Sequence, residues 1–487
     1  MKVGFIYVDF LKGGGGKFYH GIAYLSSVLK QSGHQTELFH IKENKDAVNL
    51  GSWLQRCKPS LLAFTATTNI YPYIKELAVS VKKDRDIPLI IGGIHATLVP
   101  EQVCAERLFD FVCVGEGEGP LAELCDALEK NQDVSSIRNI WVKTPAGYTK
   151  NSMRPLQEDL DTLPFPDREF MDYAHSYDLL RMRRGVFMAS RGCSFDCSFC
   201  CNHALKKLYK DCPESYVRFR SVDNVIAEIK EVVKRYPGIE TIIFHDDCLL
   251  LKKKWFKQLL EIYAKDIALP FSMNARVELI DRETLASAKS AGLRVLSVGI
   301  EHGSENIRKK LLNRNMSNKQ IIDAFETAHG LGIKTISYNI VGFPRERFSD
   351  MLETIKLNAR VKTETIQISI FYPYPGTKLY DIVKEKGLIG AESLDSYFEG
   401  TILKFSPFKK RQIKFILDNF ESLKITYQFL LKFPAIIHAP IFYGSLFSMW
   451  TLIFLRLENL VIALARPLAR VFKSNVKKRR DRQFVNA

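Results

Sequence analysis

The chain has 487 residues, of which 46% are hydrophobic and 25% charged, a composition typical of folded globular proteins and not of disordered or collagen-like chains. The formal net charge is +16, but residues 401–487 alone contain 16 Lys and Arg against 4 Asp and Glu. The first 400 residues are therefore nearly neutral, and the basic character belongs to the C-terminal region. At about 100–200 residues per domain, the length predicts two to four domains.

Ten cysteines occur in a chain whose N-terminal segment, MKVGFIYVDF, lacks the long apolar run of a secretory signal. An even number of cysteines would also allow disulfides, but those form in exported proteins. We therefore expect a cytoplasmic protein with reduced thiols that are available to bind metal.

Residues 1–145 alternate short apolar runs with helical stretches, which predicts a doubly wound, Rossmann-like α/β domain. The expected strands are 3–8, 61–65, 88–91 and 110–114, and the expected helices are 21–31, 71–83 and 120–129. Such sheets bind ligands at the carboxyl ends of their strands, and glycines gather there at 13–16, 92–93 and 115–119. None of these segments has the spacing of a phosphate loop or dinucleotide fingerprint. Taken alone, each indicates tight turns and not a ligand site.

Residues 146–185 contain three prolines and no sustained period, which predicts a linker that crosses the surface. From residue 186 to about 400, six strands alternate with helices. This pattern predicts an open, partial (β/α)6 barrel, because a closed barrel needs eight strands. The expected strands are 186–190, 241–245, 271–275, 294–300, 334–341 and 365–371, and the expected helices include 222–235, 254–264, 282–291, 318–331 and 348–360.

Residues 401–487 are expected to form a basic, apolar and mainly helical C-terminal region. The stretch 433–455 has no formally charged residue and exceeds the roughly 20 residues that span a bilayer, but Pro434 and Pro440 make its first half a poor helix. Excess Lys and Arg suits an anionic membrane surface. We therefore expect peripheral association with the inner face of the cell membrane, with a buried helix pair and a basic end as the alternative. Without a recognisable binding module, no nucleic-acid partner is expected.

Three cysteines are spaced C-x3-C-x2-C directly after the first expected barrel strand: Cys193, Cys197 and Cys200. Three thiolates on one loop can each bind one iron of a cubane [4Fe–4S] cluster, which leaves the fourth iron open. A structural zinc ion needs a fourth protein ligand, which Cys201 or His203 could supply. Zinc is therefore the alternative at this loop.

This loop resembles the cluster loop of the radical S-adenosylmethionine (SAM) superfamily, C-x3-C-x-Φ-C, with Phe199 as the aromatic residue. Segments at the ends of later strands resemble further family motifs in the expected order, at 298–305, 339–344 and 372–377. The resemblance implies that Asp246 and Asp247 lie at the contact to the methionine amino group, although the usual Gly-Gly-Glu is absent. It also implies a SAM contact by Arg276 and a ribose contact by Glu301.

Each of these residues also has a structural interpretation. Asp246 and Asp247 could cap the next helix, since Asp is a favoured N-cap. Arg276 could pair with Glu278 on the surface. Glu301 ends an apolar strand, where a carboxylate is costly unless it is paired, and this favours a role in the site.

The N-terminal region resembles the cobalamin-binding domain that precedes many radical SAM barrels, through segments 92–97 and 114–118. The resemblance implies cobalamin contacts by Gly93, His95, Gly115, Glu116 and Gly117. No D-x-H-x-x-G motif supplies an axial histidine, so the lower axial ligand stays open. His95 could equally be a core or surface histidine.

Together the resemblances imply three cofactors: a [4Fe–4S] cluster, SAM and cobalamin. The cluster, reduced by a donor such as flavodoxin or ferredoxin, would cleave SAM to a 5′-deoxyadenosyl radical. We expect methyl transfer to an unactivated carbon of a small molecule, which the C-terminal region suggests is apolar or lipid-like. The alternatives are a radical cyclase, oxidase or rearrangement enzyme, a non-catalytic protein that senses cobalamin, SAM or iron, and a zinc-bearing structural protein.

Overall fold

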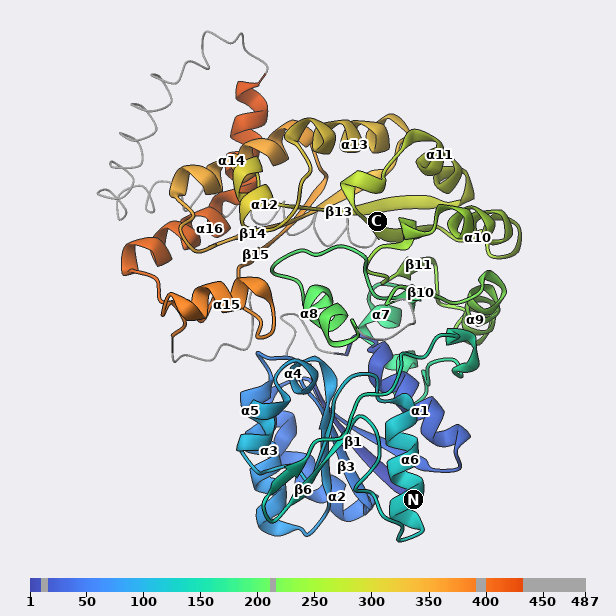
Figure 1. Cartoon of the computed structure of the whole chain (residues 1–487). Helices are drawn as coiled ribbons and strands as arrows, with labels where there is room; N and C mark the ends of the chain where they lie inside the picture. The colour runs from blue at the N-terminus through green and yellow to red at the C-terminus, as the bar shows by residue number, and fades with distance from the viewer. Residues whose placement is uncertain (10–15, 211–215, 391–399, 432–487) are drawn as a thin grey trace.

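The computed structural model describes residues 1–9, 16–210, 216–390 and 400–431 (Figure 1). An N-terminal α/β domain, blue in Figure 1, lies below a larger α/β domain that runs from green to orange. A long helix, red-orange in the same view, lies on the flank of the larger domain. Three features of the sequence fall outside the described residues: Cys212, the apolar stretch 433–455 and most of the glycine run 13–16.

The N-terminal domain is built on a seven-stranded sheet in the order β2-β1-β3-β4-β5-β6-β7. The first five strands in this order are parallel, and β6 and β7 continue the sheet antiparallel. The strands are β1 (Lys2–Val8), β2 (Gln35–Ile41), β3 (Leu61–Thr65), β4 (Leu89–Gly92), β5 (Phe111–Cys113), β6 (Ile140–Thr144) and β7 (Gly147–Thr149). The doubly wound prediction is confirmed. The sequence did not predict β2, a partly exposed edge strand with several polar residues, nor β6 and β7.

Both faces of this sheet are covered by helices, because alternate strand residues point to opposite faces. Phe5 packs with α1 and α6 on one face, and its neighbour Ile6 packs with α2 and α3 on the other. The helices are α1 (His20–Gln31), η1 (Asn44–Asn49), α2 (Leu50–Cys57), α3 (Tyr71–Asp84), α4 (Gly93–Leu98), α5 (Pro100–Ala105) and α6 (Glu118–Glu129).

The connector between the domains is partly buried, so the prediction of a surface linker is wrong. It contains η2 (Leu160–Thr162), η3 (Tyr173–His175) and α7 (Tyr177–Leu180). Tyr173 and Asp178 are fully buried. Arg168 lies over the rings of Phe18 and Phe187, one from each domain, and pairs with Glu228 at 2.9 Å. Met171 and Tyr173, which follow the prolines of the connector, belong to one hydrophobic cluster with residues of both domains.

The larger domain is an open half-barrel of six parallel strands in the order β15-β14-β13-β12-β11-β8, which confirms the partial (β/α)6 prediction. The strands are β8 (Arg184–Phe187), β11 (Thr241–Phe244), β12 (Phe271–Ala275), β13 (Leu293–Glu301), β14 (Lys334–Val341) and β15 (Thr365–Ile370). The first expected strand, 186–190, is divided. Its end forms β9 (Ser190–Arg191), which leaves the barrel to pair with β10 (Arg218–Phe219).

Helices follow the strands and cover the outside of the barrel (Figure 1). The helical elements of this domain, including α8 at its junction with the N-terminal domain, are α8 (Cys201–Leu208), α9 (Val222–Arg235), η4 (Leu249–Leu251), α10 (Lys253–Asp266), η5 (Val277–Leu279), α11 (Arg282–Ala291), α12 (Glu305–Lys310), α13 (Asn318–Gly330), α14 (Phe348–Val361) and α15 (Lys378–Glu385). The five expected helices are confirmed to within two residues at each end, because each has a clear apolar stripe. The sequence did not predict the shorter helices α8, α12 and α15.

The last described helix is α16 (Pro407–Leu430), which begins at the N-cap Ser406. Its Ile413, Ile416 and Phe420 pack against Met351 and Ile355 of α14. The part of the C-terminal region that the structure describes is therefore helical and docked on the barrel. Among the described residues, no helix combines the length and the apolar character needed to cross a membrane.

Candidate active site between the two domains

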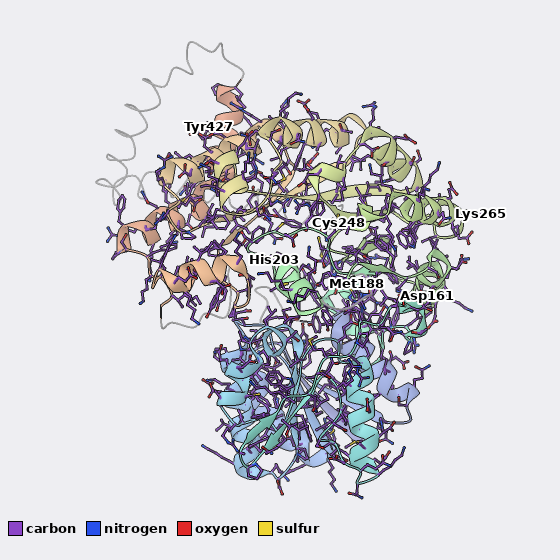
Figure 2. All side chains as sticks on the ribbon, in the orientation of Figure 1. Asp161, Met188, His203, Cys248, Lys265 and Tyr427 are labelled. Carbon is purple, nitrogen blue, oxygen red and sulfur yellow. The ribbon has the colours of Figure 1, made fainter. Side chains whose placement is uncertain are left out.

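A cavity of about 430 Å³ lies where the carboxyl edge of the N-terminal sheet faces the barrel. This is the place where doubly wound sheets bind ligands, and the volume falls in the usual range of ligand pockets. Residues of α8 and α4 line the cavity, and Figure 1 shows α8 above α4 at the junction of the two domains. Met188, which lines the cavity, is labelled at this junction in Figure 2.

One wall of the cavity is glycine backbone from the ends of β4 and β5. Gly93 has a φ of +87°, and a Cβ there would lie 2.5 Å from Thr65 Oγ1. Gly115 has a φ of +93°, and its Cβ would lie 2.3 Å from the Tyr209 hydroxyl. Both positions therefore require glycine. Gly117 lines the same wall with an ordinary φ of −101°. A wall without side chains lets a large flat ligand lie against the backbone, which fits a corrin.

His95 is not among the residues that line this cavity. Its ring packs against Tyr71, with ring centroids 4.1 Å apart, and its Nδ1 lies 3.2 Å from Thr68 Oγ1. Burial disfavours the charged imidazolium and lowers the pKa of His95 to about 4. In this structure His95 lies in the core, outside the lining of the cavity, and its contact with cobalamin stays a prediction.

Glu116 lines the cavity, and its carboxylate accepts hydrogen bonds from two arginines of the larger domain. Arg218 contacts it at 2.7 and 3.0 Å, and Arg191 at 3.1 Å. Arg191 also donates to Glu118 at 2.6 Å. Burial opposes the charge on Glu116, yet the hydrogen bonds and charges of Arg218 and Arg191 outweigh it and lower its pKa to about 2. The structure therefore gives Glu116 an interdomain ion pair that sequence reasoning did not foresee.

The cysteine loop is held against the barrel by its backbone. Gly192, which opens the loop, has a φ of +86°, and a Cβ there would lie 2.2 Å from the Tyr216 carbonyl oxygen. The backbone N–H of Ser198 donates to the Leu312 carbonyl at 3.1 Å, and its carbonyl accepts from Leu379 at 2.9 Å. Helix α8 begins at Cys201, directly after the third motif cysteine. The loop is thus fixed by segments more than 100 residues away.

Cys193, Cys197 and Cys200 do not surround a single point in this structure. Zinc–sulfur bonds of 2.3 Å in a tetrahedron place the sulfurs about 3.8 Å apart. Among the described residues, the group of three ligand atoms within 4.8 Å of one another is His34, Asp126 and Glu129. The binding of three irons by the three motif cysteines stays a prediction.

Arg276 and Arg314 reach the cluster loop from the barrel. Arg276 Nη1 donates to Cys197 Sγ at 2.9 Å, and its Nη2 pairs with Glu278 at 2.6 Å. The sequence allows a pairing of Arg276 with Glu278 on the surface. The pair forms, but Arg276 is buried, with 7% exposure. Arg314 lies 3.9 Å from the same sulfur and 3.3 Å from Glu301 Oε1.

The two adjacent aspartates after β11 have different surroundings. Asp246 is 1% exposed and accepts hydrogen bonds from the backbone of Ala189 at 3.1 Å and from the Ser190 hydroxyl. Burial raises the pKa of Asp246 to about 6. Asp247 lines the cavity, accepts from Asn202 Nδ2 at 2.9 Å, and also has a pKa raised by burial. Neither caps a helix, because α10 begins only at Lys253.

Glu301 ends β13 with a φ of +64°, a conformation that is strained for a residue with a side chain. Burial raises the pKa of its carboxyl group, against the charges of Arg314 and Arg276. The adjacent His302 is fully buried, and its Nε2 lies 2.8 Å from Glu346 Oε1. Glu346 also accepts hydrogen bonds from the backbone N–H groups of Gly342 and Phe343, so it joins the two barrel motifs at 298–305 and 339–344.

Sequence reasoning missed several polar residues of the site. They are Asn202, Tyr209, Tyr216, Arg218 and Arg314. Asn202 lies two positions after Cys200, the last cysteine of the motif, and this proximity in the sequence was the available signal. The others lie in stretches without a motif, so their position depends on tertiary contacts.

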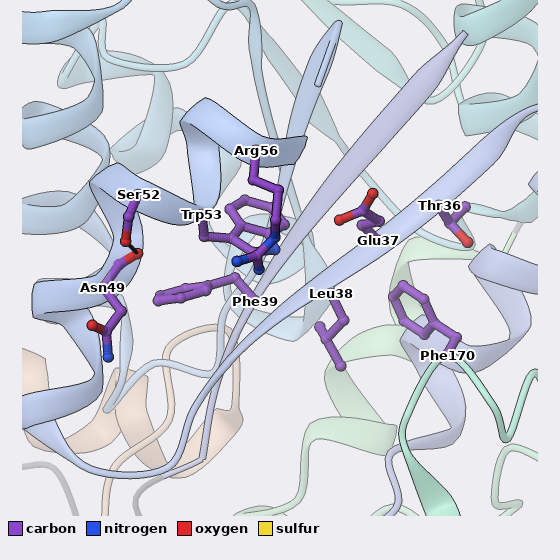
Figure 3. A pocket seen from close by; sticks show the side chains of 9 residues that line it. All are labelled: Thr36, Glu37, Leu38, Phe39, Asn49, Ser52, Trp53, Arg56 and Phe170. Atoms are coloured by element: carbon purple, nitrogen blue, oxygen red, sulfur yellow. Dashed lines mark hydrogen bonds between the residues drawn. The ribbon is translucent and has the colours of Figure 1, made fainter. Parts of the chain in front are cut away.

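A second cavity, of about 570 Å³, opens at the free edge of the N-terminal sheet (Figure 3). It is lined by β2, by α2 and by Phe170 of the connector. Glu37, Trp53 and Arg56 are among its residues, and none of the expected site residues is. The cavity lies outside the region where the glycine wall and the cysteine loop meet.

Comparison with protein-family models matches residues 188–357 to the radical SAM superfamily and residues 19–125 to the B12 binding domain. An uncharacterized methyltransferase of Pyrococcus horikoshii is 28% identical over 410 residues, 82% of this chain and 85% of the relative. The anaerobic magnesium-protoporphyrin IX monomethyl ester cyclase of Rubrivivax gelatinosus is 26% identical over 401 residues, with 79% and 70% covered. The hopanoid C-3 methylase of Methylococcus capsulatus is 26% identical over 379 residues, with 74% and 67% covered.

Two solved structures share the fold at low identity. The radical SAM methyltransferase TsrM from Kitasatospora setae, solved with cobalamin and a [4Fe–4S] cluster, has a TM-score of 0.63 at 16% identity, with 79% of this chain and 75% of that chain covered. The cobalamin-dependent radical SAM enzyme OxsB has a TM-score of 0.66 at 15% identity, with 86% and 67% covered. The two family matches, on the two domains described above, imply a [4Fe–4S] cluster, SAM and cobalamin as the cofactors. This chain therefore contains a radical SAM domain that is preceded by a B12 binding domain.

Proposed function

We propose that this enzyme transfers a methyl group to a carbon atom of an apolar small molecule. The observation that carries the proposal is the cavity between the domains, which has the glycine wall on one side and the flank of the cysteine loop on the other. When bound, the cluster and SAM supply a radical that can activate a carbon–hydrogen bond, and cobalamin supplies the methyl group.

The chain's own residues would hold these groups and keep water away. Cys193, Cys197 and Cys200 would bind three irons, and the glycine wall would carry the corrin. Asp247 faces the cavity beside Asn202, which donates to its Oδ2. Its Oδ1 could accept a hydrogen bond from an amino group such as that of SAM. Because Asp246 is used to fix β9, we assign the contact to Asp247.

An apolar substrate is supported by the lining of the cavity. The side chains that face it include Phe5, Ile22, Leu25, Phe64, Ile90, Leu156, Met188 and Leu205. A relative that shares 26% identity is named for methylation of a hopanoid. Apolar walls favour an apolar ligand because burial of apolar surface drives binding.

We further propose that the enzyme takes this substrate from a membrane surface. Exposed large apolar side chains gather on or next to α16, at Phe408, Ile425, Phe429 and Leu431. Residues 401–487 also carry +12 of the formal net charge of +16, from 16 Lys and Arg against 4 Asp and Glu. Apolar contact and charge attraction together can hold a protein on anionic lipid where one alone is marginal.

A radical cyclisation is the second candidate, because a relative of 26% identity is named as a cyclase. The two reactions give products of different mass. Methylation adds one methyl group to the substrate, whereas cyclisation adds no carbon.

The experiment is anaerobic reconstitution with iron, sulfide and hydroxocobalamin, followed by incubation with a low-potential reductant, a bacterial lipid extract and SAM that carries a trideuterated methyl group. We expect 5′-deoxyadenosine, S-adenosylhomocysteine and a lipid that gains one deuterated methyl group. Cys197→Ala should abolish all three. A product without deuterium would assign the protein to cyclisation or oxidation, and absence of 5′-deoxyadenosine with a full cluster would contradict an enzymatic role.

A further inference from the structure

Two arginines converge on one of the three cluster cysteines. Arg276 Nη1 donates a hydrogen bond to Cys197 Sγ at 2.9 Å, and Arg314 Nη1 lies 3.9 Å from the same sulfur. Arg276 uses a different nitrogen, Nη2, to pair with Glu278, so its guanidinium lies between that carboxylate and the sulfur of Cys197. The Nη1 of Arg314 lies 3.3 Å from Glu301 Oε1 as well as near the sulfur.

Arg276 has little freedom to leave this position. Its guanidinium lies over the Phe195 ring, 3.6 Å from the centroid, and Nη2 is 2.6 Å from Glu278 Oε1. The side chain is 7% exposed. A planar guanidinium fixed by a carboxylate on one side and a ring on its face presents its remaining N–H in one direction. That direction is toward Cys197.

The other two cluster cysteines have different neighbours. In the described part of the chain, the sulfur of Cys200 accepts a long contact from Asn202 Nδ2 at 3.9 Å and interacts with the thiol of Cys201. No guanidinium hydrogen bond to Cys193 or Cys200 is present among the described residues. The arginine contact is therefore specific to Cys197.

A hydrogen bond to a ligand sulfur changes the electron affinity of an iron–sulfur cluster. Reduction adds one electron to the [4Fe–4S]²⁺ state and gives [4Fe–4S]⁺, so negative charge increases on the iron and sulfur atoms. Donors near a thiolate ligand stabilise that added charge, and hydrogen bonds to the sulfurs are among the factors that set cluster potentials.

We propose that Arg276 is a positioning residue that raises the reduction potential of the cluster through its hydrogen bond to Cys197, whether or not SAM is bound. This role differs from the SAM contact that the family resemblance implied for Arg276. The proposed role requires a cluster at Cys193, Cys197 and Cys200, but it does not require methyl transfer. A failure of the proposed function would therefore leave this proposal unaffected.

The test is a potentiometric titration of the full-length protein, reconstituted with iron and sulfide but without SAM or cobalamin. Dithionite supplies the electron, redox mediators set the potential, and the EPR signal of the reduced cluster reports its fraction. We expect reduction of Arg276→Gln to be about tenfold less favourable than that of the wild type, a fall of about 59 mV in midpoint for a one-electron couple. Arg276→Lys, which keeps the charge but not the guanidinium geometry, should lie between them.

Arg168→Gln is the matched control, because Arg168 is buried to a similar extent, at 5% exposure, pairs with Glu228 and does not line the cavity. Its midpoint should equal that of the wild type. Equal midpoints for wild type and Arg276→Gln, at equal iron content, overturn the proposal, and a change in SAM binding alone would assign Arg276 to SAM. If Arg276→Gln does not retain its iron, Arg276→Lys decides: a lower midpoint supports the proposal and an unchanged one overturns it.

Discussion

Arg191 Nη1 lies 3.1 Å from Glu116 Oε1, although the two residues belong to different domains. Arg191 stands two positions before Cys193, and Glu116 lies in the glycine-rich turn after β5. Arg218 of β10 binds the same carboxylate at 2.7 Å. The wall expected to carry cobalamin is thereby tied to the strand pair that opens the cluster loop. The domain interface and the active site share these residues.

Glu116→Gln should loosen this junction. Without the carboxylate, the buried positive charges of Arg191 and Arg218 lose the negative charge that stabilises them. We therefore expect the free energy of unfolding to fall by about 3 kcal/mol. Chemical denaturation at neutral pH measures it. Glu118→Gln is the control, because Glu118 pairs only with Arg191 among the described residues and should cost less.

The same pair predicts a pH dependence. The pKa of Glu116 in the folded protein is lowered to about 2, from an ordinary value of 4.5. Its contribution to stability is therefore complete above about pH 4.5 and is lost as the pH falls toward 2. The stability difference between wild type and Glu116→Gln should shrink over that interval. A difference that stays constant down to the acid limit of folding would contradict the ion pair.

Gly117→Leu should abolish cobalamin retention while the barrel stays folded. Gly117 has an ordinary φ, and a Cβ would lie 3.3 Å from Leu25 Cδ2, so a side chain can be accommodated at modest cost while it fills the cavity. Absorbance of the desalted protein after incubation with hydroxocobalamin measures retention. Gly33→Leu is a control on the same domain, because nothing lies within 4 Å of its Cβ position, although its positive φ will cost some stability. Full retention by Gly117→Leu would place cobalamin elsewhere.

Alanine at Cys193, Cys197 or Cys200 should remove the cluster, because each thiolate holds one iron. Iron analysis and the broad absorbance of the cluster measure the loss. Cys201→Ala and Cys248→Ala are the controls, one beside the motif and one buried close to it, and both should keep their iron. Loss of iron in Cys201→Ala with retention in Cys193→Ala would reverse the assignment of ligands.

Asp246→Asn should change how stability depends on pH. The pKa of Asp246 is raised to about 6 from an ordinary value of 3.8, so the folded state favours its protonated form. The resulting stability is present below about pH 4 and is lost as the pH rises through about 6. Relative to wild type, Asp246→Asn should become more stable by about 3 kcal/mol across this range. Urea denaturation at several pH values checks this, and parallel curves would show that Asp246 ionises normally.

Truncation after residue 431 tests the proposed membrane surface while it keeps α16, which packs on α14. Full-length protein should float with anionic liposomes at low salt and be released by high salt, because charges are screened. The truncated protein should bind more weakly and still form its cluster. If full-length protein remains unbound to anionic liposomes at low salt, the proposed route to a membrane-held substrate is wrong.

The sequence alone determined the fold class, the half-barrel and the cysteine loop. Helices such as α9 and α11 were predicted with their observed bounds, because an apolar stripe of helical period is local information. The cysteine spacing is local too, so no tertiary contact was needed to find it. The glycines after β4 and β5 indicated only tight turns by themselves, and the cobalamin contacts there came from the family resemblance.

The tertiary structure alone decided how these parts meet. Arg276 and Arg314 reach Cys197 across 79 and 117 positions of sequence, and Arg218 reaches Glu116 across 102. Such pairs carry no periodic signal, because each side chain is fixed by strands that are adjacent only in the folded sheet. For the same reason the sequence could not show that Asp246 fixes β9 while Asp247 faces the cavity, or that Tyr173 and Asp178 of the connector are buried between the domains.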